Sequence, residues 1–243
     1  MADLDNAYYL KKKAGIMREF DLTVRFQKRS LVPHFDGAKI DGWLARTRAM
    51  FESLIPQFPY IGGAVNEFTK YLVRPSMLIP LVRILRDEGV PVRQVGQIIY
   101  EMAAAGYNFI PAPLRWWQAR GYFSEKQKAQ WRRTARQTQL RRYPGDWVCE
   151  YVEGDGETFE YGIDVTECGL LKFWRAQGVE EYVPYLCLTD WALWQSLGVE
   201  VKRTQTLANG GTCCDYRYVG RSKDVPGGWP PESLPEWTGE YEL

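Results

Sequence analysis

Histidine is almost missing from this chain, because His34 is the only one among 243 residues. A Ser–His–Asp or Cys–His relay could use only that imidazole. His34 lies in the loop-like segment SLVPHFDG, where a histidine is usually just solvated. Zinc sites built from several histidines are excluded. Any catalysis must therefore rest mainly on other side chains.

Long apolar runs are missing too. The most apolar stretch, from Met77 to Leu85, is too short to span a bilayer and carries Arg83. The opening MADLDNAYYLKKK has charges before any apolar run, which is not the pattern of a signal peptide. We therefore expect no membrane contact and a cytoplasmic protein.

Cysteine is scarce, and no C-x-x-C pair occurs. The five cysteines are an odd number, which in a reducing compartment favours free thiols. We expect neither a structural metal nor a cofactor. Hydrophobic residues are 45% and charged residues 25%, so the chain can form a globular protein with a sizeable core.

Charge is unevenly distributed although the net charge is only +1. Residues 1–145 contain 24 Lys and Arg against 12 Asp and Glu, whereas residues 146–243 contain 7 against 18. Segments of opposite sign attract each other and can share a cleft, or each sign can lie on a solvated face. Both interpretations stay open.

Periodicity divides the chain into three regions. Residues 1–145 are predicted to be helical, with an amphipathic helix over 6–29, a second one capped by Asp41, and a segment over 66–88 broken near Pro75 and Pro80. Residues 146–219 are predicted to form an α+β region, and residues 220–243 a Pro/Gly/Trp-rich tail. The tail is expected to be an extended arm, held by Trp229 and Trp237 against the body or a second subunit, or else disordered. A homo-oligomer stays open.

The α+β region is predicted to follow the order β-β-α-α-β-β. Residues 147–152 and 158–163 alternate like strands, two helices follow, with Thr166 as the cap of the first, and residues 199–207 and 212–219 form a hairpin. The expected fold class is α+β, with the helical half packed on a small antiparallel sheet.

One helix, over residues 124–142, is strongly basic. Ser124 fits its cap, and only Glu125 opposes seven Lys and Arg. Nucleic acid is one conceivable partner. The rest of the chain has no recognition motif, so we expect a solvated helix that docks on the acidic half, and no nucleic-acid partner.

Thiols and one carboxylate supply the candidate chemistry. Cys187 and Asp190 are three residues apart on a predicted helix and so share a face, which pairs a thiol with a base. Cys168 lies in the first helical turn, where the helix dipole stabilises a thiolate. Cys214 and Cys213 are adjacent in a strand, so only one faces inward. The thiols can instead be inert core residues, or bind zinc with Asp190.

Three motifs in order give a more specific signal: C-x-x-D at Cys187–Asp190, R-T-x-T-x-A-x-G-G at Arg203–Gly211, and C-D-[FY]-R at Cys214–Arg217. Together with Cys168, they resemble the L-2-amino-thiazoline-4-carboxylic acid hydrolase family over about residues 146–219. The resemblance implies an α+β protein related to hydrolases that open a cyclic isothiourea at its amidine carbon. The positions that match the family's pattern are Cys168, Cys187, Asp190, Thr206, Gly210, Cys214 and Asp215.

The function that this resemblance implies is hydrolysis of a non-peptide C–N bond in a small cyclic isothiourea or amidine-like substrate. Cys187 is the first choice as nucleophile, with Asp190 as base or cation holder and Cys168 as second choice. Cys214 and Asp215 complete the catalytic candidates. Thr206 and Gly210 are candidates for substrate binding, and Arg203 for holding a substrate carboxylate. The alternative is a non-catalytic module that senses a ligand or metal through its thiols.

Overall fold

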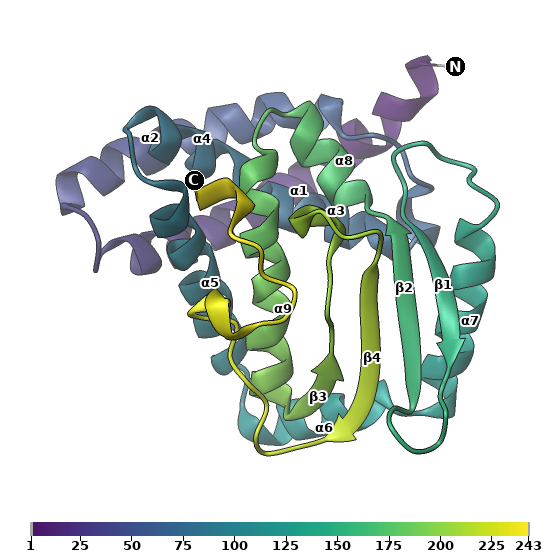
Figure 1. Cartoon of the computed structure of the whole chain (residues 1–243). Helices are drawn as coiled ribbons and strands as arrows, with labels where there is room; N and C mark the ends of the chain where they lie inside the picture. Colours follow the sequence, from purple (N-terminus) through teal and green to yellow (C-terminus); the bar gives the residue numbers. More distant parts are fainter. Residues whose placement is uncertain (1, 243) are drawn as a thin grey trace.

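The computed structural model describes residues 2–242, with side chains from residue 7 onward, and has an α+β architecture. A four-stranded antiparallel sheet lies on one side and the helices lie behind it (Figure 1). Within the described residues, no helix is both long enough and apolar enough to cross a membrane. The helices are α1 (Ala2–Leu31), α2 (Gly37–Leu54), α3 (Phe68–Ser76), α4 (Ile79–Asp87), α5 (Val92–Asn108), α6 (Ala112–Tyr122), α7 (Glu125–Thr138), α8 (Gly169–Ala176) and α9 (Val183–Leu197).

The N-terminal half is helical and breaks near Pro75 and Pro80, as predicted, but the cap of the second helix differs. The cap of α2 is Asp36, whose carboxylate accepts a hydrogen bond from the Ala38 N–H, and not Asp41. Asp41 lies inside α2 and pairs with Lys28 at 2.5 Å. The break expected within residues 66–88 falls between α3 and α4, where Pro80 occupies the first turn of the second helix.

The sheet consists of β1 (Val148–Glu153), β2 (Tyr161–Glu167), β3 (Val199–Lys202) and β4 (Cys214–Arg221), in the spatial order β1-β2-β4-β3. β2 and β4 are central, and Val165 pairs with Cys214 in their register. Because side chains alternate along a strand, Cys214, Tyr216 and Tyr218 face the helices while Asp215 and Arg217 face away. β4 therefore presents one thiol and two phenols to the helical layer.

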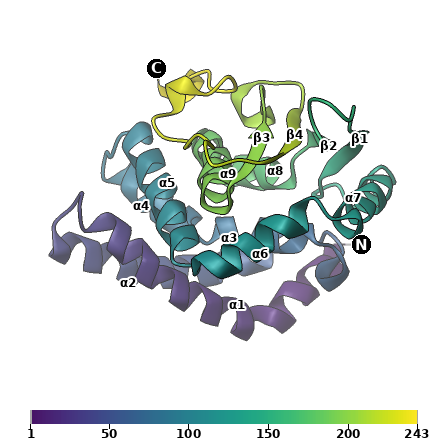
Figure 2. The same cartoon turned by 90° about the horizontal axis from the view of Figure 1, so that it is seen from below.

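Helix α9 is the central element of the helical layer, between the sheet and α5 (Figure 2). Gly96 of α5 makes this close packing possible, because a Cβ atom there would lie 2.0 Å from the Tyr185 ring of α9. Gly198, with φ of 64°, ends α9 in the left-handed conformation. The position of α9 against the sheet sets where Cys187 and Asp190 point.

The basic helix α7 packs against β1. Ser124 caps it, as predicted, by accepting a hydrogen bond from the Gln127 N–H. Arg132 pairs with Glu153 at 2.6 Å, and Lys128 pairs with Glu160 at 2.9 Å. The basic helix thus docks on carboxylates of the acidic half.

The second hairpin differs from its prediction, because β3 ends at Lys202 and β4 begins at Cys214. Directly after Arg203, the Thr204 and Gln205 N–H groups donate to the Asp215 carboxylate and not to a neighbouring strand. The chain between them is a loop with one short helical turn, Leu207–Asn209. Similarly, Thr166 belongs to β2, and the cap of α8 is Cys168.

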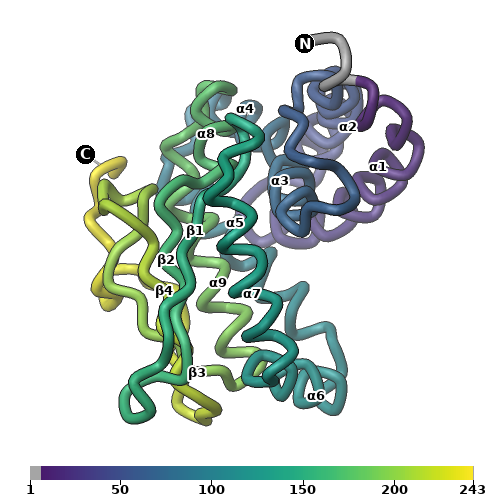
Figure 3. Tube along the Cα trace, turned by 90° about the vertical axis from the view of Figure 1, so that its right-hand side faces the viewer, coloured from purple at the N-terminus to yellow at the C-terminus, as the bar shows by residue number. Residues whose placement is uncertain are grey.

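The tail after β4 crosses beyond the edge strand β3 and lies over α9 and α5, as Figure 3 shows with the sheet seen nearly edge-on. Trp229 stacks on Tyr100 of α5 at 6.2 Å between ring centroids, and Trp237 meets Tyr185 of α9 at 5.1 Å. Both tryptophans therefore contact the body of the same chain.

Candidate functional site

The centre of the site is an ion pair between Asp190 on α9 and Arg203 at the end of β3. The Arg203 Nη1 donates to Asp190 Oδ2 at 2.7 Å, and the Tyr216 hydroxyl donates to the same oxygen at 3.3 Å. No donor among the described residues reaches Asp190 Oδ1. The Asp190 side chain is 37% exposed, whereas that of Arg203 is fully buried. Asp190 is therefore the solvent-facing end of a buried charged network.

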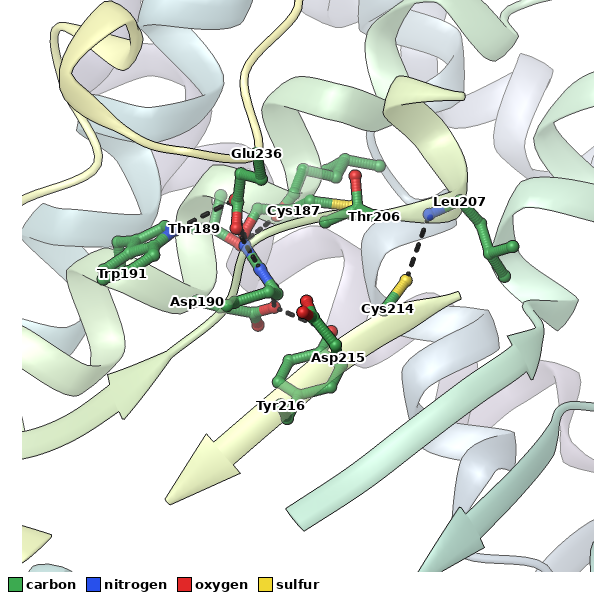
Figure 4. A network of polar contacts seen from close by, with 12 residues as sticks. Cys187, Thr189, Asp190, Trp191, Thr206, Leu207, Cys214, Asp215, Tyr216 and Glu236 are labelled. Atoms are coloured by element: carbon green, nitrogen blue, oxygen red, sulfur yellow. Dashed lines mark hydrogen bonds and ion pairs between the residues drawn. The ribbon is translucent and has the colours of Figure 1, made fainter. Parts of the chain in front are cut away.

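Glu236 of the tail completes this network. It accepts two hydrogen bonds from Arg203, from Nε and from Nη2, both at 2.6 Å, and a third from the Trp191 indole at 3.0 Å. Figure 4 shows Glu236 reaching from the tail segment toward Asp190, with Trp191 beside it. The side chains of Arg203 and Glu236 are both 0% exposed. One guanidinium faces two carboxylates, so the group carries a net charge of −1 when all three are ionised.

Aromatic rings enclose the guanidinium. Its carbon lies 5.1 Å from the Trp194 ring centroid, 5.8 Å from that of Trp191 and 5.0 Å from that of Tyr216. Burying a charge is costly unless it is paired, and here two carboxylates and three π faces compensate for the loss of water. Removal from water raises the pKa of Asp190, and the attraction of Arg203 opposes that shift.

Three thiols gather beside the ion pair. Cys187 is one turn before Asp190 on α9, Cys214 is the first residue of β4, and Cys168 caps α8. They are close enough for Cys214 and Cys168 to influence the titration of Cys187. Figure 4 shows Cys187 and Cys214 approaching the same region from helix and strand. The structure therefore brings together Cys168, Cys187, Asp190, Arg203 and Cys214.

All three thiols are neutral near pH 7. Burial raises the pKa of Cys187 well above its ordinary value, and it raises that of Cys214 to about 12. Burial also raises the pKa of Cys168, although its sulfur accepts a hydrogen bond from the Leu171 N–H at 3.4 Å. The helix terminus thus does not produce the stabilised thiolate that its position alone suggests, because the loss of water outweighs the Leu170 and Leu171 N–H donors and the nearby Lys172.

The loop between β3 and β4 places the two substrate-binding candidates, Thr206 and Gly210, in different surroundings. Thr206 is fully buried, and its hydroxyl accepts a hydrogen bond from the Asn209 amide at 3.0 Å. The Leu207 N–H donates to the Cys214 sulfur at 3.3 Å. Gly210 is exposed and takes the left-handed conformation with φ of 80°. Thr206 and Leu207 therefore adjoin the thiol cluster, whereas Gly210 shapes the outer turn.

Asp215 lies apart from the cluster, on the opposite face of β4. Its carboxylate accepts hydrogen bonds from the Thr204 and Gln205 N–H groups at 2.8 and 2.9 Å, and from the Thr204 hydroxyl at 2.5 Å. These bonds fix the start of the loop directly after Arg203. The geometry supports a positioning contribution of Asp215 more than contact with a substrate.

His34 lies outside this site. His34 contacts Glu101 of α5 at 2.8 Å, near the turn between α1 and α2. Among the described side chains, those of residues 7–242, no three or more from His, Cys, Asp or Glu are arranged to hold a metal ion. Glu236 is the member of the site that motif spacing did not identify, because it lies in the aperiodic tail.

Comparison with known proteins identifies one family. The model of the family described as L-2-amino-thiazoline-4-carboxylic acid hydrolase matches residues 118–218, less than half of the chain. The match runs from α6 through α7 into β4 and stops before the tail. It confirms the resemblance carried by the Cys, Asp and glycine motifs. Neither the curated proteins nor the solved structures contain a match to the chain.

Proposed function

We propose that this chain hydrolyses a non-peptide C–N bond in a small cyclic isothiourea or amidine-like molecule. The reason is that residues 118–218 match the L-2-amino-thiazoline-4-carboxylic acid hydrolase family. The family is named for a hydrolase, and the substrate class is our inference. The observation that carries the proposal is the partly exposed Asp190 carboxylate, held by Arg203 at 2.7 Å and one turn from the Cys187 thiol.

Asp190 is suited to hold a protonated amidine. An amidinium presents parallel N–H donors, which match a carboxylate as an arginine does. Oδ2 is occupied by Arg203 and Tyr216, which leaves Oδ1 for the ligand. The net negative charge of Asp190, Arg203 and Glu236 favours a cation, and the partly desolvated surroundings strengthen that attraction.

Cys187 is the proposed nucleophile. Its thiol is neutral in the free protein, but a bound cation favours the thiolate and so lowers the pKa. The sulfur forms a bond to the amidine carbon while Asp190 takes the thiol proton and passes it to the ring nitrogen, whose bond to that carbon breaks. Water then adds to the same carbon, and the Cys187 sulfur leaves with a proton. The net reaction adds one water and opens the ring.

Cys214, Cys168 and Thr206 are proposed as the wall behind the reacting carbon. Cys214 and Thr206 are buried and Cys168 is partly buried, so together they exclude water from the back of the thiol cluster. The Leu207 N–H fixes the Cys214 sulfur. Exclusion of water strengthens the electrostatic contacts of the substrate with Asp190. Asp215 and Gly210 are proposed to hold the loop that carries Arg203 and Thr206.

Incubation with 2-amino-2-thiazoline and with its 4-carboxylate tests this function. We expect a ring-opened product one water heavier, seen by mass spectrometry, and an adduct on the peptide that contains Cys187 after rapid acid quench. The adduct should be absent from a Cys187→Ser chain. A folded native chain that converts neither compound nor other cyclic isothioureas would contradict the proposal.

A further inference from the structure

Glu236 binds Arg203 in the manner in which proteins bind a ligand's carboxylate. Two parallel N–H···O bonds of 2.6 Å join the guanidinium to the two Glu236 oxygens. Such bidentate pairs provide the geometric specificity with which arginine recognises carboxylates. The acid that completes this pair comes from the chain itself, 33 residues beyond Arg203 in the sequence.

The remaining donors of Arg203 are largely used as well. Nη2 also donates to the Cys187 carbonyl at 2.9 Å, and Nη1 donates to Asp190. Four of the five N–H groups that a guanidinium offers therefore have partners within the chain. A substrate carboxylate could form a bidentate pair with Arg203 only by displacing Glu236, or by breaking the contacts of Nη1 with Asp190 and of Nη2 with the Cys187 carbonyl.

Charge points in the same direction as geometry. With Glu236 in place, Asp190, Arg203 and Glu236 together carry −1, and the exposed member is the acid Asp190. A ligand that brought its own carboxylate would meet two acids and one fully engaged cation. Like charges in a poorly solvated site repel strongly.

We propose that Glu236 is a specificity-determining residue: it occupies the carboxylate-binding position of Arg203, so that the site selects a cationic isothiourea or amidine without a carboxylate. This inference rests on the proposed function for the class of substrate. Glu236 lies in the tail, outside residues 118–218 that match the hydrolase family. The selectivity is thus assigned to the C-terminal tail, which lies outside the part of the chain that matches the family.

Two ligands that differ only in the carboxylate test the selectivity. We expect 2-amino-2-thiazoline to bind the native chain at least about tenfold more tightly than its 4-carboxylate by calorimetry. In Glu236→Ala the preference should shift toward the 4-carboxylate by about tenfold or more. The control is Glu232→Ala, which removes an exposed tail carboxylate that also pairs with an arginine, Arg93, at 2.6 Å. It should leave the preference unchanged.

Acetate tests the carboxylate position without any amidine. Glu236→Ala should melt at a lower temperature than the native chain, because Arg203 is left buried and unpaired. Acetate should raise the melting temperature of that variant more than chloride at equal ionic strength, and should not do so for the native chain or Glu232→Ala. If Glu236→Ala does not fold in chloride, refolding of that variant in acetate and in chloride at equal ionic strength provides the same comparison.

The outcomes separate the two proposals. A native chain that binds the 4-carboxylate as tightly as 2-amino-2-thiazoline, or a preference unchanged in Glu236→Ala, overturns the selectivity while hydrolysis can stand. Acetate no better than chloride for Glu236→Ala overturns the carboxylate position itself. If acetate acts as expected but no amidine binds or is hydrolysed, the proposed function fails, and with it the assigned ligand class.

Discussion

At the scale of single residues, the site combines a preformed ion pair with thiols that are protonated in the free protein. Burial raises the pKa of Cys187, Cys214 and Cys168, so none is a thiolate near pH 7. Asp190 is held by Arg203 and Tyr216 at the solvent-facing end. In the proposed function, a cation bound beside Asp190 activates the Cys187 thiol, which links reactivity to the presence of the substrate.

The first prediction separates Cys187 from the other thiols. Cys187→Ser should keep the fold and lower turnover by roughly 10²-fold or more, because a hydroxyl replaces the attacking thiol. Cys213→Ser is the matched control. Cys213 is the residue before β4, and it lies near Asp164 and Asp215, away from the thiol cluster. Steady-state turnover of both variants, with melting curves on the same samples, decides the assignment. Equal losses in the two variants would contradict it.

The second prediction concerns thiol labelling. Iodoacetamide should modify all the cluster thiols slowly near pH 7, because the thiolate is the reactive form. A saturating cyclic isothiourea should accelerate labelling of Cys187, or protect it if a covalent adduct forms, without changing Cys213. Mass-mapping of labelled peptides follows each cysteine. Fast labelling of Cys187 in the free protein would show that its thiol is not held neutral.

Sequence reasoning found the parts of the site that depend on local spacing. A spacing of three residues on a helix places Cys187 and Asp190 on one face. Alternation along a strand places Cys214 and Asp215 on opposite faces. It did not find Glu236, because the tail has no periodicity and the contact spans 33 residues. Nor did it find that Arg203 is enclosed, since burial of a charge depends on partners brought together by the fold.

At the scale of elements, the packing of α9 between α5 and the sheet positions the site. The contact of Gly96 with the Tyr185 ring lets the two helices approach closely. Helices were predictable from their apolar spacing, and the caps Ser124 and Gly198 from their residue types. The early end of β3 was not, because the Thr204 and Gln205 N–H groups bond to the Asp215 side chain, a contact that the β-pattern of residues 199–207 does not reveal.

The third prediction compares two glycines of α5. Gly96→Ala should destabilise the chain by about 1–3 kcal/mol, because its Cβ would overlap the buried Tyr185 ring. Gly106→Ala should stabilise it by up to about 1 kcal/mol, because that position has no atom within 4 Å and alanine favours a helix. Urea unfolding measures both. Equal effects of the two changes would contradict the close packing of α5 on α9.

At the scale of the whole molecule, opposite charges join the two halves of the chain. Helix α7 carries basic residues that pair with carboxylates of β1 and the following turn. The tail adds a further set, in which Arg93 of α5 pairs with Glu232 and Glu242. The charge asymmetry of the sequence left open whether the halves attract or each sign lies on a solvated face. It could not show which pairs form, because side-chain pairing depends on the register of α7 on the sheet.

The fourth prediction follows from the buried thiols and concerns stability at high pH. The pKa of Cys149 is raised to about 11 and that of Cys214 to about 12, so both stay protonated in the folded protein above pH 9. In the unfolded chain they ionise near their ordinary pKa, about 8.5. Stability should be fully present below that pH and fall as the pH rises toward 11.

Melting curves from pH 7 to 11 measure this loss. Cys149→Ala and Cys214→Ala should each be less stable than the native chain at pH 7, because a buried group is removed. Each should also lose less additional stability on the way to pH 11. Parallel losses in the native chain and both variants would show that the thiols do not contribute to the alkaline response.

The central claim is that Asp190 holds and activates a cationic substrate, and turnover of 2-amino-2-thiazoline by two asparagine variants tests it most directly. Asp190→Asn and the control Asp164→Asn each neutralise a carboxylate that pairs with an arginine. In the control, the Asp164 carboxylate lies 2.6 Å from the Arg217 guanidinium, on the outer face of the sheet. The account predicts that folded Asp190→Asn loses roughly 10²–10⁴-fold in turnover, while Asp164→Asn stays near the native rate. A folded Asp190→Asn chain with near-native turnover would contradict the account.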